Sequence, residues 1–122
     1  MANMIKSHHF SAILPVSQAV YQWTDQDFLK LLKTLVQQVG LNTVGEMAIA
    51  FQPQGMSAVV LLEESHVALH FWPEESKVSV DIHVCDFQHN NYEKAEQLTH
   101  LLTLHLSSSD HCDDWHHLSL IR

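Results

Sequence analysis

The sequence predicts an α+β fold, a two-layer α/β sandwich in which two helices cover one face of a mainly antiparallel sheet. Two segments carry apolar residues at helical spacing, and several others show the apolar runs or strict alternation that are typical of strands. The central strands are separated by connections of hairpin length, which favours antiparallel pairing. The 122 residues fit one domain, 1–122, with the element order β-α-β-β-β-β-α-β.

The first two elements are a short strand and the clearest helix of the chain. The strand covers residues 8–14, and the helix lies between Thr24, a typical N-cap residue, and Gly40, a typical C-terminal cap. Asp25 and Asp27 occupy the first helical turn, where negative charge is favourable. The apolar stripe of this helix is expected to consist of Phe28, Leu31, Leu32, Leu35, Val36 and Val39.

Four strands are predicted for the centre of the chain. Pro53-Gln54-Gly55 supplies a turn between the first and second of them, and Pro73-Glu74-Glu75-Ser76 interrupts the pattern before the fourth. The fourth alternates apolar and polar residues along its whole length, a strong period-two signal. These strands are expected over residues 43–51, 57–64, 66–72 and 78–85.

A second helix and a last strand complete the predicted domain. The helix is expected over residues 92–106, capped by Asn90 or Asn91, and the strand over residues 115–121. The helix is expected to turn four residues towards the core: Ala95, Leu98, Leu102 and Leu106.

With both helices on one side, the other face of the sheet has no helix to cover it. The side chains expected on that face are too polar for a core and too aromatic for a plain solvent-exposed surface, so we interpret it as a surface that meets a partner or a ligand. The residues are His66, His70, Trp72, Asp81, His83 and Cys85.

Composition excludes two classes of partner. Six Lys and Arg against fourteen Asp and Glu give a formal charge of −8, which repels phosphate backbones and argues against nucleic acid. No apolar run approaches the ~20 residues of a membrane helix, and the first residues lack the apolar stretch of a signal peptide. We therefore expect a cytoplasmic protein with no membrane contact, in which Cys85 and Cys112 stay reduced.

One stretch of the sequence carries most of the chemical information. It reads Glu64-Ser65-His66-Val67-Ala68-Leu69-His70-Phe71-Trp72-Pro73-Glu74, and Asp81 and Cys85 follow it. Upstream, residues 51–57 fit the pattern Phe-x-Pro-x-Gly-x-Ser. Because many specified positions match at fixed spacing, residues 49–86 closely resemble the prokaryotic S-adenosylmethionine decarboxylase proenzymes.

The resemblance implies a pyruvoyl group as the cofactor. Decarboxylation of an α-amino acid builds negative charge on the α-carbon, and no ordinary side chain accepts it, whereas a ketone that forms an imine with the substrate does. In such proenzymes the Ser65 hydroxyl attacks the carbonyl of Glu64, the resulting ester eliminates, and pyruvoyl caps the new terminus. The expected products are a β chain of residues 1–64 and an α chain of residues 65–122.

The resemblance also assigns roles to individual residues. His70 and Ser57 take part in self-processing, and an imidazole suits proton transfer near neutral pH. Cys85 is the acid that protonates the α-carbon after carbon dioxide leaves. For substrate binding, the resemblance implies that Phe51 stacks on the adenine, Glu74 accepts hydrogen bonds from the ribose and Trp72 lines the pocket. It further implies a homodimer in which two sheets meet face to face, with active sites near the interface.

Three functions remain open from the sequence. The first is decarboxylation of S-adenosylmethionine, which supplies the aminopropyl donor for spermidine synthesis. The second is decarboxylation of ornithine or arginine by a diverged relative, because Asp86 adds a carboxylate beside Cys85. The third is a non-catalytic homologue that stays uncut and regulates or binds a partner.

The segment His111-Cys112-Asp113-Asp114-Trp115-His116-His117 raises the question of a zinc site. Its spacing matches no standard structural zinc site, in which ligands come in two closely spaced pairs. We therefore interpret it as a solvated turn and the start of a strand, and we expect no metal.

Overall fold

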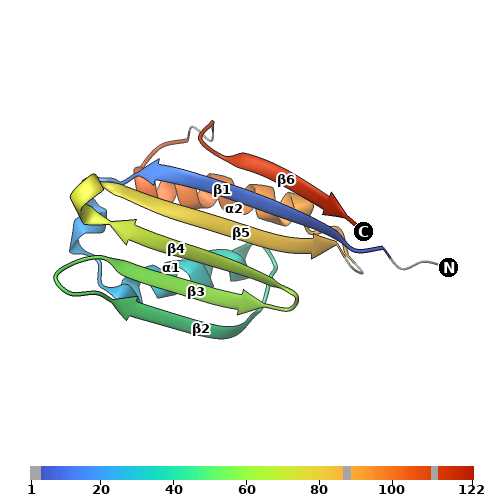
Figure 1. Cartoon of the computed structure of the whole chain (residues 1–122), viewed down its shortest axis with the longest axis horizontal. Helices are drawn as coiled ribbons and strands as arrows, with labels where there is room; N and C mark the ends of the chain where they lie inside the picture. The colour runs from blue at the N-terminus through green and yellow to red at the C-terminus, as the bar shows by residue number, and fades with distance from the viewer. Residues whose placement is uncertain (1–3, 87–88, 111–112) are drawn as a thin grey trace.

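A computed structural model describes residues 4–86, 89–110 and 113–122. Its sheet has six strands in the order β2-β3-β4-β5-β1-β6, and every neighbouring pair is antiparallel (Figure 1). The strands are β1 (Lys6–Pro15), β2 (Thr43–Ala50), β3 (Met56–Leu62), β4 (Ser65–Trp72), β5 (Lys77–Asp86) and β6 (His116–Ile121).

Two α-helices form the second layer, on one side of the sheet (Figure 1). Helix α1 (Asp25–Gln38) lies across β2 and β3, and helix α2 (Tyr92–Ser107) lies across β1 and β5. The two-layer α+β fold and the predicted element order are therefore confirmed. Among the described residues, no helix has the length and apolar character needed to cross a membrane.

Local sequence explains why α1 begins and ends where it does. Thr24 and Asp27 form a reciprocal capping box, in which the Asp27 N–H donates to Thr24 Oγ1 (3.1 Å) and the Thr24 N–H donates to Asp27 Oδ2 (2.8 Å). At the other end Gly40 has a φ of +91°, a conformation that glycine adopts without steric cost. The predicted apolar stripe is buried except for Leu31, which is only partly covered.

Helix α2 starts at the predicted residue, and the two asparagines that were candidates for its cap make different hydrogen bonds. The Asn90 side chain accepts a hydrogen bond from the Tyr92 N–H (3.0 Å). Asn91 is the N-cap residue by position, but its side chain donates to the carbonyl of Cys85 (2.9 Å). The four predicted core residues of this helix are all buried.

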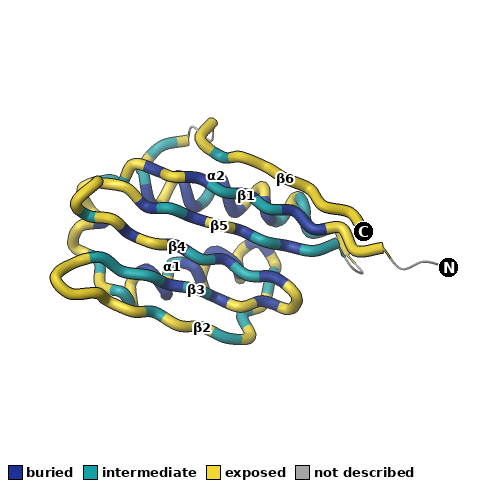
Figure 2. The backbone as a smooth tube through the Cα atoms, viewed as in Figure 1, coloured by how far each residue is buried: buried dark blue, intermediate teal, exposed yellow. Residues whose placement is uncertain are grey.

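Alternation along the strands separates the core face from the open face (Figure 2). On β5 the four predicted apolar positions between Val78 and Val84 are buried against the helices, and the intervening side chains are not. The same alternation on β4 buries Ser65, Val67 and Leu69 and leaves His66, His70 and Trp72 uncovered or half-covered. The helix-free face predicted from the sequence is thus present.

One local prediction is wrong, and two short helices add detail that the sequence did not predict. The segment 57–64 does not form strand to its end, because Glu63 and Glu64 make the two-residue turn that joins β3 to β4. The break at residues 73–76 begins as a short 3-10 helix, η2 (Pro73–Glu75), which suits a proline at its first position. A second 3-10 helix, η1 (Gln18–Gln22), was not predicted, since five residues give no periodic signal.

Candidate active site

The predicted cleavage point lies in the tight turn of the β3–β4 hairpin. Leu62 pairs with Ser65 across the hairpin, so Glu63 and Glu64 alone make the connection. Glu64 has a φ of +59°, in the left-handed region that costs a non-glycine residue about 1–2 kcal/mol. The neighbouring Ser65 is 7% exposed, and its side chain belongs to the helix-facing set of β4. The bond expected to break therefore joins a strained residue to a buried hydroxyl.

An open pocket of about 670 Å³ lies beside this turn. Its walls come from the turn, from the connection between α1 and β2, from the end of β5 and from the start of α2. Glu64 and Cys85 both line it, although twenty residues separate them in the sequence. The structure therefore brings the predicted cleavage point and the predicted proton donor to one cavity.

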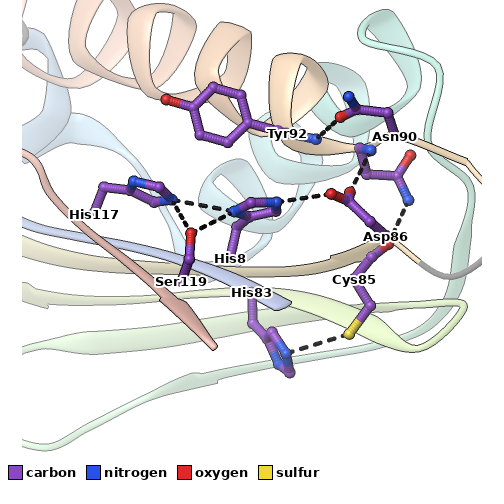
Figure 3. A network of polar contacts seen from close by, with 9 residues as sticks. His8, His83, Cys85, Asp86, Asn90, Tyr92, His117 and Ser119 are labelled. Carbon is purple, nitrogen blue, oxygen red and sulfur yellow. Dashed lines mark hydrogen bonds and ion pairs between the residues drawn. The ribbon is translucent and has the colours of Figure 1, made fainter. Parts of the chain in front are cut away.

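Cys85 is held as a neutral thiol. Burial raises its pKa, and the carboxylates of Glu64 and Asp86 raise it further, because they disfavour a thiolate nearby. Its Sγ lies 3.5 Å from His83 Nε2, and both side chains project from the side of the sheet opposite His8 and Tyr92 (Figure 3). A thiol that keeps its proton at neutral pH can act as a proton donor.

Three histidine rings meet on the helix-free face next to this thiol. His83 stacks on His9 at a centroid distance of 4.3 Å, and the edge of His66 meets it at 5.1 Å. Burial lowers the pKa of His83, and the neighbouring His9 and His66 lower it further. Sequence reasoning placed His66 and His83 on this face but missed His9, which only the register of β1 against β5 puts opposite His83.

A second group of predicted site residues lies at the other end of the sheet. Ser57 Oγ and His70 Nδ1 are 2.6 Å apart, joined by a hydrogen bond across paired positions of β3 and β4. Phe51 and Trp72 are about half exposed, at 48% and 51%, where β2 and β4 end. Glu74 follows in η2. The structure thus gathers the predicted processing pair and the predicted substrate-binding residues at one end of the central strands.

The two groups are too far apart to act together within one chain. Five steps of strand separate the Leu62–Ser65 pair from the Ser57–His70 pair, which amounts to about 17 Å. Because Ser65 and His70 are an odd number of residues apart on β4, their side chains also point to opposite faces. A single chain therefore does not bring His70 to the Glu64–Ser65 bond.

Sequence reasoning missed a partly buried polar network behind the thiol (Figure 3). His8, only 2% exposed, lies 2.8 Å from Asp86 Oδ2 through Nε2, and its Nδ1 lies 3.0 Å from Ser119 Oγ and 3.2 Å from His117 Nε2. Asp86 Oδ1 also accepts the Asn91 backbone N–H at 2.7 Å. No local sequence signal reveals this network, because it joins both ends of the chain.

The carboxylate at the centre of this network stays ionised. Burial alone would raise the pKa of Asp86, but the hydrogen bonds from the Asn91 N–H and from His8 outweigh burial and lower it. Asp86 thereby connects β5 to β1 and to the start of α2.

Within residues 4–86, 89–110 and 113–122, no three His, Cys, Asp or Glu side chains are grouped so as to hold a metal ion. His111 and Cys112 of the segment considered for zinc lie outside the described residues. Asp113, Asp114, His116 and His117 are exposed.

Comparison with known proteins gives matches to one family. A family model described as S-adenosylmethionine decarboxylase matches residues 21–112. The chain is 31% identical to a proenzyme of that name from Persephonella marina over 77 residues, which are 63% of this chain and 58% of the relative. It is 38% identical to the proenzyme from Aquifex aeolicus over 60 residues, 49% of this chain and 44% of that one.

A solved structure supports the fold independently. The crystal structure of the adenosylmethionine decarboxylase from Aquifex aeolicus matches with a TM-score of 0.72 at 22% identity, over 99% of this chain and 91% of that one. At this identity the match establishes the fold. The chain spans about half the length of the first curated relatives it matches, 58% and 44%.

Proposed function

Because this chain belongs to the S-adenosylmethionine decarboxylase family, we propose that it is a self-processing, pyruvoyl-dependent decarboxylase that acts on S-adenosylmethionine. The observation that carries the proposal is the meeting of the strained turn residue Glu64 and the neutral Cys85 thiol at one pocket. The product of such a reaction is the aminopropyl donor for spermidine synthesis.

The turn suits formation of a pyruvoyl group from the chain itself. Ser65 Oγ attacks the Glu64 carbonyl carbon, the C–N bond breaks, and an ester replaces the amide. Elimination then releases residues 1–64 with a carboxylate end, and hydrolysis of the remaining dehydroalanine gives pyruvoyl and ammonia. An amide-to-ester shift is uphill, and the left-handed conformation of Glu64 raises the energy of the starting amide and so lowers that barrier.

Cys85 then serves the decarboxylation step. The pyruvoyl ketone supplies the electron acceptor that loss of carbon dioxide requires. The α-carbon needs a proton afterwards, and the Cys85 thiol lines the same pocket as Glu64, the residue next to the new terminus. Burial and the two nearby carboxylates keep that thiol protonated until it is used.

We propose that a second copy of the chain supplies Ser57 and His70. The separation of about 17 Å within one chain excludes an intrachain role of this pair at Ser65. Two sheets packed face to face in opposite directions would place one copy's Ser57–His70 end against the other copy's turn. The helix-free face carries large exposed apolar side chains that such a contact would bury: Ile13, Met47, Ile49, Leu61, Trp72 and Leu118.

The structure gives no support to a basic amino acid as substrate. That alternative rests on a free carboxylate at Asp86, whereas both oxygens of Asp86 are occupied, one by His8 and the other by the Asn91 N–H. The remaining alternative, an uncut binding protein, differs from the proposal in covalent structure and is tested directly.

The decisive test combines intact mass with substrate turnover. We expect the purified protein to show two fragments that part between Glu64 and Ser65, and S65A to keep the full-length mass. Carbon dioxide release from carboxyl-labelled S-adenosylmethionine should exceed release from ornithine and arginine. A chain that folds but keeps its full mass would refute the proposal that the protein is a self-processing decarboxylase. Faster turnover of ornithine or arginine would refute the proposal that S-adenosylmethionine is its substrate.

A further inference from the structure

The contact between Cys85 and His83 has a chemical use that the proposed mechanism leaves open. A thiol that gives its proton to the substrate becomes a thiolate, and it must regain a proton before the next turnover. His83 Nε2 lies 3.5 Å from Sγ, within hydrogen-bond reach of sulfur. The two residues alternate on β5 and therefore share the helix-free face.

We propose that His83 is the positioning residue of Cys85: its ring holds the thiol by a hydrogen bond and returns a proton to Sγ after each turnover. This inference rests on the proposed decarboxylase function. The S–H bond breaks as the C–H bond of the product forms, which leaves a negative charge on Sγ. That charge favours protonation of the imidazole by a solvent water, whose hydroxide leaves to bulk solvent, and the imidazolium N–H then passes the proton to Sγ, so that thiol and neutral ring are both restored.

The surroundings of the pair set its resting state as thiol and neutral imidazole. His9 from β1 and His66 from β4 face the His83 ring, and a positive charge on either opposes a charge on His83. On the thiol side, Glu64 and Asp86 oppose a thiolate. Two other titratable side chains of this face lie on β5, Asp81 and Lys77, and Asp81 accepts a hydrogen bond from the Ser11 hydroxyl (2.6 Å). A charged thiolate–imidazolium pair is thus formed only when turnover removes the thiol proton.

Alkylation of Cys85 tests the pairing without any catalysis. In S65A/C112S, which retains Cys85 as its single thiol, the rate of iodoacetamide labelling is followed by mass against pH. A thiol coupled to an imidazole gives two inflections, which belong to the pair as a whole. We expect two inflections in this parent and one in H83Q, whose amide keeps a hydrogen-bonding group but does not titrate.

H66Q is the matched control, because His66 touches the His83 ring but makes no bond to sulfur. We expect H66Q to keep both inflections and to move the imidazole inflection to higher pH, since one opposing charge is gone. One inflection in the parent, or two in H83Q, would overturn the pairing.

Turnover of the cut enzyme tests the relay. We expect H83A to be cut normally, to keep its KM and to lose at least about tenfold in kcat, and added imidazole to restore part of that loss. Unchanged kcat in H83A, or a loss that imidazole does not restore, would overturn the relay. Wild-type chain that stays uncut would overturn the proposed function and the relay with it, whereas the alkylation profile of the same material would still decide the pairing.

Discussion

Asp86 shows how one side chain can fix the position of the candidate proton donor next to it. Its two oxygens bind His8 on β1 (2.8 Å) and the backbone N–H of Asn91, the N-cap residue of α2 (2.7 Å). Asn91, whose N–H is one of these donors, also binds the Cys85 carbonyl through its side chain. The main chain at Cys85 is thus held from two directions by contacts that involve no substrate.

Replacement of Asp86 by Asn tests this arrangement through stability. D86N keeps the shape of the side chain but loses the charge that His8 and the Asn91 N–H bind. Hydrogen bonds to charged groups contribute about 1.5–3 kcal/mol each, so we expect D86N to lower the free energy of unfolding by about that amount at neutral pH. Urea unfolding of S65A and of S65A/D86N, both uncut, measures the difference.

The pH dependence of that difference has a definite sign. The folded pKa of Asp86 is lowered from its ordinary value of 3.8, so its contribution is complete above that value and is lost as pH falls through the folded pKa. The difference in free energy of unfolding between S65A and S65A/D86N should therefore disappear only in strongly acidic solution. D81N, which alters an exposed carboxylate of the same strand, should change stability by less than about 0.5 kcal/mol. An equal loss in D81N would contradict the special role of Asp86.

Single residues were the hardest feature to predict from the sequence. The family pattern identified Cys85, but nothing near it pointed to His8 or His9, which lie more than seventy residues away. Both become neighbours of β5 only through the pairing of β1, in which Ser7 lies opposite Cys85 and His9 opposite His83. Register between distant strands is not encoded locally, so the surroundings of the thiol required the structure.

At the scale of elements, the β3–β4 turn closes a tight hairpin and also contains the residue next to the proposed cleavage point. It must close a hairpin in two residues, for which glycine or asparagine is the usual choice at a left-handed position, yet the chain has Glu64 there. The cost of about 1–2 kcal/mol is offset by the pairing of the flanking strands. We interpret the strain as stored at the bond that the proposed cleavage breaks.

Glycine at this position tests the stored strain. In the uncut S65A background, E64G should raise the free energy of unfolding by up to about 1 kcal/mol, because relief of the positive φ exceeds the entropy cost of glycine. In the wild-type background the same change should slow the appearance of the two fragments on a denaturing gel. E63G is the matched control, since Glu63 is not among the positive-φ residues, and it should only destabilise. Faster cleavage in E64G would contradict the role of strain.

Elements with local signals were predicted correctly, and those without them were not. The capping box at Thr24 and the apolar stripe of α1 lie within sixteen consecutive residues, and the alternation of β5 lies within ten. By contrast, residues 63 and 64 look like a continuation of β3 until strand pairing forces the chain to reverse there. The short η1 helix owes its position to packing of Val20, which is fully buried against the core.

At the scale of the whole molecule, the candidate site is split between two ends of one sheet. The turn, Ser65 and Cys85 lie at one end, and Phe51, Ser57, His70, Trp72 and Glu74 lie at the other. Sequence alone could not reveal this division, because the motif is continuous along the chain. The proposed twofold pairing of helix-free faces would convert the division into two complete sites, each with a turn from one copy and a Ser57–His70 pair from the other.

Co-expression of two inactive variants tests this shared site. Neither S65A nor H70A should be cut alone, because the first lacks the nucleophile and the second lacks half of the processing pair. In a mixed dimer, the intact turn of the H70A chain faces the intact Ser57 and His70 of the S65A chain. We therefore expect the H70A chain to be cut when, and only when, it is produced together with S65A, and a tag on one chain distinguishes the two by mass.

The control follows from the same geometry. When the S65A chain also carries H70A, no intact processing pair remains in any dimer, and the tagged chain should stay whole. A site built within one chain predicts the opposite pattern, in which mixing never rescues the H70A chain, because each turn would then depend on the His70 of its own chain. Rescue without dimers in light scattering would also contradict the shared site, since the contribution of a second copy requires contact between the two sheets.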